Sequence, residues 1–289
     1  MLSALSSQES AVYGAFLSSA DLVVLGSQEK VNGFANSLSL KTLIDYDPEA
    51  AASAAAFSSK RVFTASPIYS ETSPLVYAGK IAPSNAIVFI AESNQEIMDS
   101  IVLAYRVAED PKVSAPAAVL YEYPGFIESV RLPNIAAVKN FLQKPKPGKP
   151  NIEAAIHVIE KTEDLWKKKF HRSFGLFECY KTEDAKEILV MSGFHFPTCK
   201  TAVDRLRVGG RKAGAVRVRT VNPFHSEGIS KILSSAEKIS VLDSATFGAL
   251  LADKTPSVKS RFTYTKYLSV DDFINIFANI GKEGNFQIK

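Results

Sequence analysis

The sequence predicts an α/β protein built from two doubly wound, mostly parallel sheets. Short apolar runs such as AIVFIA and EILVM alternate with longer segments whose apolar residues recur at helical spacing. This alternation is typical of parallel strands joined by crossover helices. The chain has 289 residues, of which 46% are hydrophobic and 22% charged, a composition that suits two globular domains of ordinary size.

A stretch rich in proline, glycine and lysine, residues 144–150, separates the two domains in the sequence. Such a composition is typical of an extended, solvated connector. We therefore expect a first domain over residues 1–143 and a second over residues 151–289. The second begins with a long amphipathic helix that we expect to brace the two domains, with Trp166 as a core anchor on its apolar face.

The elements expected in the first domain follow from apolar runs and their spacing. A polar helix over residues 3–19 opens the chain, and a short strand at DLVVL follows it. The later elements are a strand at VFTAS, a strand at AIVFIAES, a helix at NQEIMDSIVLAYRVAED, a strand at APAAVLYEY and a short helix near 134–142.

The second domain repeats the alternation of strand and helix. Its expected elements are EILVMSG, the helix through TCKTAVDRLRVGG, the strand KAGAVRVRTVNPF, the helix SEGISKILSS, the strand KISVLDS and a closing helix in LSVDDFINIFANI. Ser269 and Asp272 resemble a capping box at the start of that closing helix, with aspartate in place of glutamate.

Composition argues against several classes of partner. The net charge is only +4, and the basic residues are not interleaved with aromatic ones, so we expect no nucleic-acid partner. No apolar run approaches the roughly 20 residues of a membrane span, and the first residues do not resemble a secretory signal. Two cysteines, Cys179 and Cys199, fit a reducing compartment and are too few for an iron–sulfur cluster. We expect a cytoplasmic protein.

Glu49 is the leading candidate for chemistry. Asp47 suits the N-cap of a helix and Pro48 its first position, so Glu49 lies in the first turn, where free backbone N–H groups favour a carboxylate. Capping alone would explain this placement. The following AAASAAA, however, gives the helix one face of very small side chains, which allows close approach by a neighbouring backbone or cofactor.

Two further positions carry weaker signals. Ser27 follows a predicted strand, at the end where open α/β sheets bind ligands, although chain reversal alone would also explain a Gly-Ser turn there. His195 and Cys199 lie four residues apart, as at the start of a helix, but Pro197 between them indicates a turn, and one His/Cys pair supplies too few ligands for a closed zinc site. No P-loop, Rossmann fingerprint, HExxH or GxSxG motif is present.

Several segments, taken together and in order, resemble the α subunit of 2-oxoacid:ferredoxin oxidoreductases of the pyruvate synthase type. VFIAESNQEIMDSIVLAYRVAED is similar to a strand and ES-N-Q-E helix of that subunit, and FTAS at 63–66 is similar to its FTASQG. PEAAASAAA at 48–56 resembles its glutamate-bearing helix of small residues. KFHRSFGLFECYKTEDAKEILVMSG and AVDRLRVGGRKAGAVRVRTVNPF resemble its transketolase C-terminal-like domain.

The resemblance implies an enzyme subunit that oxidatively decarboxylates a 2-oxoacid, most readily pyruvate, with thiamine diphosphate, coenzyme A and ferredoxin. The first domain would then be the pyrimidine-type domain, and Glu49 would hydrogen-bond N1′ of the aminopyrimidine. Ser27, Thr64 and Ser66 would also contact the cofactor. The resemblance places Mg²⁺ with the diphosphate in a β subunit, and the iron–sulfur clusters in other partner chains such as γ- and δ-type subunits.

The chain also departs from the family pattern. LGSQEK stands where the family has a Y-P-I-T-P-like turn, and the strand and arginine-bearing loop that follow FTASQG in the family have no counterpart here. Two interpretations stay open. The chain is either a compact catalytic α subunit, with substrate contacts supplied by a partner or by Lys60, Arg61 or Lys80, or a degenerate scaffold or regulatory subunit of such a complex.

Overall fold

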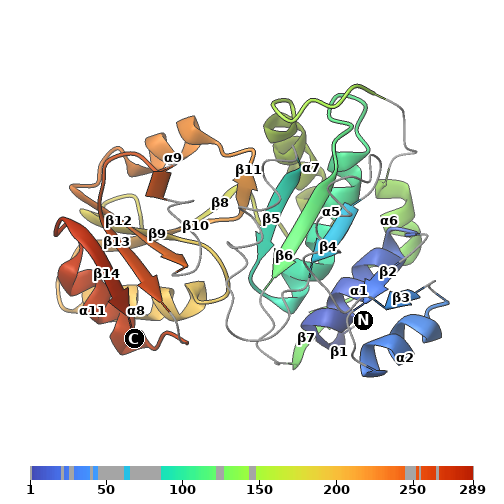
Figure 1. Cartoon of the computed structure of the whole chain (residues 1–289), viewed down its shortest axis with the longest axis horizontal. Helices are drawn as coiled ribbons and strands as arrows, with labels where there is room; N and C mark the ends of the chain where they lie inside the picture. The colour runs from blue at the N-terminus through green and yellow to red at the C-terminus, as the bar shows by residue number, and fades with distance from the viewer. Residues whose placement is uncertain are drawn as a thin grey trace.

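The computed structural model describes most of the chain, with several gaps. The described residues are 2–20, 23–25, 29–39, 42–44, 62–65, 86–121, 127–142, 148–244, 252–253, 255–264 and 267–288. Figure 1 shows two lobes, with the N-terminal half of the chain in one and most of the C-terminal half in the other.

The helices are α1 Ser7–Leu17, α2 Glu29–Ser37, α5 Asn94–Ala108, α6 Ile135–Phe141, α7 Ala155–Phe170, α8 Phe196–Val208, α9 Ser226–Leu233 and α11 Val270–Asn279. The strands are β1 Leu2–Ser6, β2 Val23–Leu25, β3 Thr42–Ile44, β4 Val62–Ala65, β5 Ile87–Ala91, β6 Ala117–Tyr121, β7 Ile127–Arg131, β8 Phe177–Tyr180, β9 Glu187–Met191, β10 Ala213–Val218, β11 Thr220–Asn222, β12 Lys238–Ser244, β13 Val258–Tyr264 and β14 Gly284–Ile288.

The larger sheet of the first lobe has the strand order β11-β5-β6-β4. β4, β6 and β5 run parallel, and β11 joins antiparallel to β5. β5 and β6 are buried at every position, as expected for strands covered on both faces. Helices α5 and α7 cover the face that carries Ile87 and Phe89.

The sheet of the second lobe has six strands in the order β14-β13-β12-β9-β10-β8. All its pairs are parallel except β10 with β8. Alternate residues of β9 serve opposite faces, since Leu189 and Met191 pack in the cluster with α8 and α11, whereas Ile188 and Val190 pack in the cluster with α9. This sheet is therefore doubly wound, and the expected fold class is confirmed.

One hydrophobic cluster extends through both lobes. It contains Val88 and Ile90 of β5 together with Ile188 and Val190 of β9, all with no exposed surface. The first sheet thus presents one face to its own helices and the other to apolar residues of the second lobe. Burial of this shared cluster links the folding of the two lobes.

Helix α7 packs on the first lobe, although it lies beyond the predicted connector. Ile159 packs beside α5, and Trp166 is completely buried against Phe141, with ring centroids 5.0 Å apart. The prediction that Trp166 is a core anchor is confirmed. The division into residues 1–143, 144–150 and 151–289 stays a prediction, to which the structure adds two features: α7 packs on the first lobe, and β11 pairs with β5.

The start of the chain corrects one expectation. The helix expected over residues 3–19 begins only at Ser7, and Leu2–Ser6 form β1, which pairs antiparallel with β7. The reason is a capping box: the Ser6 hydroxyl accepts a hydrogen bond from the Glu9 backbone, and the Glu9 carboxylate accepts one from the Ser6 backbone. The box that Ser269 and Asp272 were expected to form at α11 is confirmed.

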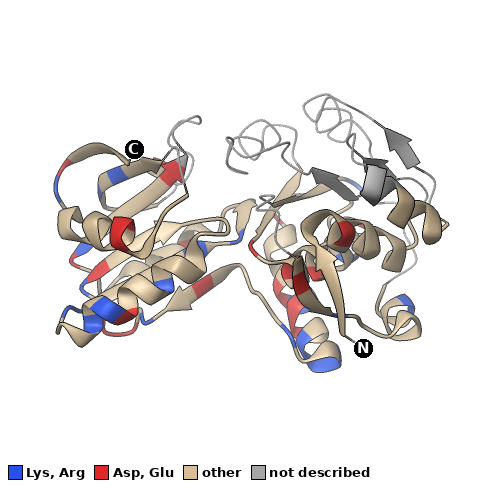
Figure 2. Ribbon diagram, turned by 90° about the horizontal axis from the view of Figure 1, so that it is seen from below, with Lys and Arg blue, Asp and Glu red and all other residues tan. Residues whose placement is uncertain are grey.

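Charged residues of both signs are spread over the two lobes, as Figure 2 shows for the described part of the chain. None of the helices in the described ranges is both long enough and apolar enough to cross a membrane.

We expect Gly14→Ala to destabilise the first lobe. A Cβ at Gly14 of α1 would lie 2.9 Å from the backbone oxygen of Met98 and 3.0 Å from Ile101 Cβ in α5, so the two helices would have to separate. Overpacking of this kind costs about 1–3 kcal/mol, which urea unfolding of the variant measures.

Gly33→Ala is the matched control. Gly33 also lies within a helix, but a Cβ there meets nothing within 4 Å. Its free energy of unfolding should stay unchanged or rise by up to about 1 kcal/mol, since alanine is the better helix former. Equal effects of the two substitutions would contradict the close packing of α1 on α5.

Candidate functional site

Of the predicted cofactor residues, the structure describes only Thr64. Thr64 lies in β4, opposite Val119 of β6 in a parallel pair. Ser27, Glu49 and Ser66 lie outside the described residues. Their proposed roles therefore stay predictions.

Each of the three residues comes, in the sequence, after the carboxyl end of a described strand. β2 and β3 are parallel, with Leu25 opposite Ile44, so their carboxyl ends meet at one edge. Ser27 and Glu49 follow these two ends in the sequence, and Ser66 follows directly after β4. Ligands in open α/β sheets bind beyond the carboxyl ends of the strands. We call the carboxyl ends of β2, β3, β4 and β5 the ligand edge, in which β2 and β3 form one sheet and β4 and β5 belong to another.

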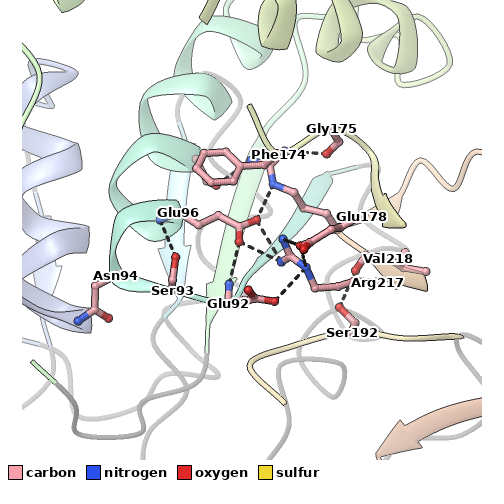
Figure 3. A network of polar contacts seen from close by, with 12 residues as sticks. Glu92, Ser93, Asn94, Glu96, Phe174, Gly175, Glu178, Ser192, Arg217 and Val218 are labelled. Carbon is pink, nitrogen blue, oxygen red and sulfur yellow. Dashed lines mark hydrogen bonds and ion pairs between the residues drawn. The ribbon is translucent and has the colours of Figure 1, made fainter. Parts of the chain in front are cut away.

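Beside the carboxyl end of β5, a buried polar network joins the two lobes. We call this network the junction; it consists of Glu92, Glu96, Ser100, Glu163, Glu178, Lys200, Arg217 and Arg219. Figure 3 shows the carboxylates of Glu92, Glu96 and Glu178 gathered around Arg217.

The two arginines of the junction share one face of an extended segment. Arg217 lies in β10 and Arg219 follows it, and the intervening Val218 points into the shared hydrophobic cluster. Alternation along a strand explains this placement, because residues two apart share a face. The exposed fractions of the two arginines are 1% and 0%, so both guanidinium groups need partners inside the protein.

Glu96 of α5 binds both arginines. Its Oε1 accepts a hydrogen bond from Arg219 Nε at 2.7 Å, and its Oε2 lies 2.9 Å from Arg217 NH1. Ser93 fixes the start of α5 by accepting a hydrogen bond from the Glu96 backbone, which places Glu96 in the first turn. There the free N–H groups of the helix also favour a carboxylate.

Every nitrogen of Arg219 donates to a partner. Besides Glu96, Arg219 binds Glu163 of α7, the Gly175 carbonyl at 3.1 Å and the Ser100 hydroxyl at 2.7 Å. Its guanidinium carbon lies 5.3 Å from the ring centroid of Phe89. A buried arginine satisfied in this way fixes α5, α7 and the end of β10 relative to one another.

Arg217 is shared by three carboxylates. Its NH2 lies 2.9 Å from Glu178 Oε2, its NH1 binds Glu96, and its Nε lies 3.1 Å from Glu92 Oε2. Burial works to lower the pKa of Arg217, but the three carboxylates raise it above its ordinary value. The guanidinium therefore stays charged.

The sequence contained signals for the junction that the prediction of site residues did not use. Two arginines interrupt the otherwise apolar strand AGAVRVRT, and two glutamates flank the start of a helix in AESNQE. Charged residues at alternate positions of a buried strand require buried partners. The sequence does not reveal which carboxylates are the partners of the two arginines, because a pair such as Arg219 and Glu163 is separated by 56 residues.

The pair His195 and Cys199 lies at the start of helix α8, so the proline between them occupies the first helical turn and forms no separate turn. Both residues are buried, and burial lowers the pKa of His195 to about 4 and raises the pKa of the Cys199 thiol. A thiol with a raised pKa is a poor nucleophile. Among the described residues, no cluster of three or more His, Cys, Asp or Glu could hold a metal ion.

We expect Glu96→Gln to lower the free energy of unfolding by about 3 kcal/mol, because it leaves two buried guanidinium groups without their shared counter-charge. Denaturant unfolding measures the change. Glu237→Gln is the control, since Glu237 pairs with Lys186 at the surface, where an ion pair contributes about 1 kcal/mol or less. Equal losses in the two variants would contradict a buried junction.

The two thiols should differ in reactivity. Cys179 is exposed and Cys199 is buried, so a thiol reagent should label one cysteine per folded chain and two after unfolding. Mass spectrometry of the labelled peptides identifies the reacting residue. Rapid labelling of Cys199 in the folded chain would contradict the placement of α8.

Sequence comparisons relate the chain to ferredoxin-dependent oxidoreductases. Residues 185–280 match the family model "pyruvate:ferredoxin oxidoreductase core domain II". Pyruvate synthase subunit PorA of Methanothermobacter thermautotrophicus is 32% identical over 209 residues, which cover 60% of this chain and 54% of the relative. The chain thus spans about half the length of such curated relatives.

Solved structures share the fold of almost the whole chain. A 2-oxoglutarate:ferredoxin oxidoreductase from Magnetococcus marinus, with 2-oxoglutarate, coenzyme A and succinyl-CoA bound, matches 96% of this chain and 65% of its own, with TM-score 0.68 and 12% identity. Transketolase from Campylobacter jejuni matches 96% of this chain and 47% of its own, with TM-score 0.55 and 10% identity. The resemblance seen in the sequence is confirmed: the chain is similar to pyruvate synthase subunits PorA, and its residues 185–280 match core domain II of pyruvate:ferredoxin oxidoreductases.

Proposed function

We propose that this chain is the α subunit of a 2-oxoacid:ferredoxin oxidoreductase, which oxidatively decarboxylates a 2-oxoacid and passes the electrons to ferredoxin. Pyruvate is the proposed substrate, because the relatives with about 30% identity are pyruvate synthase subunits. The observation that carries the proposal is the in-register, parallel pair β2 and β3, because Ser27 and Glu49 follow these two strands in the sequence.

Thiamine diphosphate, when bound, supplies a carbon nucleophile for attack on the 2-oxoacid carbonyl. What supports this cofactor is the order of the chain, in which Ser27, Glu49 and Ser66 each come after a parallel strand. In the proposal, the Glu49 carboxyl holds a proton at N1′ of the aminopyrimidine, while Ser27, Thr64 and Ser66 orient the ring.

The rest of the catalytic apparatus is assigned to partner chains. A β subunit would hold the diphosphate and Mg²⁺, and γ- and δ-type subunits would carry the iron–sulfur clusters and the route to ferredoxin. Coenzyme A is the proposed acceptor of the acyl group.

The junction would serve this function by fixing the first lobe. Glu92 directly follows β5 and Glu96 lies in the first turn of α5. Arg217 contacts both carboxylates, and Arg219 binds Glu96. Because β5 neighbours β6, which neighbours β4, a fixed β5 also fixes the strand that carries Thr64. The second domain would thus act as a support for the ligand edge.

Glu49→Gln tests the proposal in the complex purified from cells that make the chain with its partner subunits. Loss of the proton-holding carboxyl should lower thiamine-diphosphate-dependent reduction of a viologen dye with pyruvate by about 10²–10⁴-fold. Glu153→Gln, at an exposed position before α7, is the matched control and should leave the rate unchanged.

The subunit composition must be measured beside the rate. An unchanged rate in an intact Glu49→Gln complex would contradict the catalytic proposal and favour the alternative, a scaffold or regulatory subunit of the same complex. Activity with a different 2-oxoacid, still dependent on Glu49, would correct the substrate and retain the mechanism.

A further inference from the structure

Glu92 differs from the other carboxylates of the junction in how it is held. It directly follows β5, at the ligand edge of the first sheet, and its side chain is 13% exposed. Its backbone N–H donates a hydrogen bond to Glu96 Oε2 at 3.2 Å, which keeps the connection between β5 and α5 close to that helix.

Arg217 does not fully satisfy Glu92. The two groups are in ion-pair contact, with Glu92 Oε2 3.1 Å from Arg217 Nε. Nε, however, donates its hydrogen bond to Glu178 Oε2 at 3.0 Å. Glu92 Oε2 is therefore a buried oxygen that accepts no hydrogen bond from any described residue. An ionised carboxylate left in this state is costly.

The charges of the junction do not balance when all its groups are ionised. The carboxylates are Glu92, Glu96, Glu163 and Glu178, and the cations are Lys200, Arg217 and Arg219. Four negative charges face three positive ones in a largely buried site. Uptake of one proton would restore neutrality.

We propose that Glu92 holds one proton in the folded chain near neutral pH, and that its loss weakens the contact between the second lobe and the carboxyl end of β5. Glu92 is the member that carries the proton because each of the other three carboxylates accepts hydrogen bonds from a guanidinium group. The junction is then a proton-linked contact beside the ligand edge.

The charged groups that face Glu92 shift its pKa in the directions expected from their signs. Burial raises the pKa of Glu92 to about 7, Arg217 of β10 and Lys200 of α8 lower it, and Glu96 of α5 and Glu178 of β8 raise it. For Glu178, burial also favours the neutral form, but hydrogen bonding to Lys200 and the charge of Arg217 hold its pKa below the ordinary value.

The sign of the pH dependence follows from the raised pKa. A carboxyl whose pKa is higher in the folded than in the unfolded chain stabilises the fold fully below the unfolded value. That contribution is lost as the pH rises through the folded value. The relevant window therefore lies between the ordinary glutamate pKa of 4.5 and about pH 7.

Glu92→Gln tests the proposal, because glutamine imitates the protonated form at every pH. We expect the variant and the wild type to melt alike at about pH 4, and the variant to melt higher by about 4 °C or more at about pH 8.5. The opposite result, a variant that loses stability at high pH, would show that Glu92 is ionised and overturn the proposal.

Glu178→Gln is the matched control. Since Glu178 is ionised and hydrogen-bonded to Arg217 and Lys200, its replacement should lower the melting temperature at about pH 8.5. A titration of the wild type, labelled with ¹³C at glutamate carboxyl carbons, does not depend on how any variant folds. It should show one carboxyl titrating near neutral pH, and its absence would also overturn the proposal. None of these measurements uses activity, so the proposal can fail separately from the proposed function.

Discussion

The structure depends above all on one carboxylate, Glu96, which binds two buried arginines of the neighbouring lobe. An unpaired guanidinium inside a protein is strongly destabilising, so Arg217 and Arg219 can stay buried between the lobes only while Glu96 pairs with them. The hydrophobic cluster shared by β5 and β9 lies along the same boundary. Apolar burial supplies the affinity of the two lobes, and the junction sets their orientation.

This arrangement would let the second domain support the proposed ligand edge, although that edge lies in the first lobe. The ligand edge belongs to strands of the first lobe, where β5 is fixed by the junction at its carboxyl end and by β11 and β6 along its two edges. β11 is part of the same segment as the arginines, so one stretch, residues 213–222, contributes strands to both sheets. This segment therefore links the two sheets covalently.

The sequence predicted the fold well where the physical signal is local. Apolar runs located β5, β6 and β9, and helical spacing located α5. The sequence pattern failed where pairing with a distant strand determines the structure. The half-exposed segment IESVR is strand β7 because β1 pairs with it. The segment TVN pairs with β5 as β11, whereas the sequence predicted that it extends β10. The site was predicted from resemblance at Glu49, whereas the junction arises from contacts between residues far apart in the sequence, which periodicity cannot reveal.

Native-state hydrogen exchange tests most directly whether the junction makes the two lobes one cooperative unit. The slowest backbone amides of β5 and of β10 should exchange through the same opening reaction, with equal free energies and equal sensitivity to denaturant. In Glu96→Gln both sets should lose the same protection. Two separate levels of protection, with one lobe opening while the other stays closed, would contradict the account.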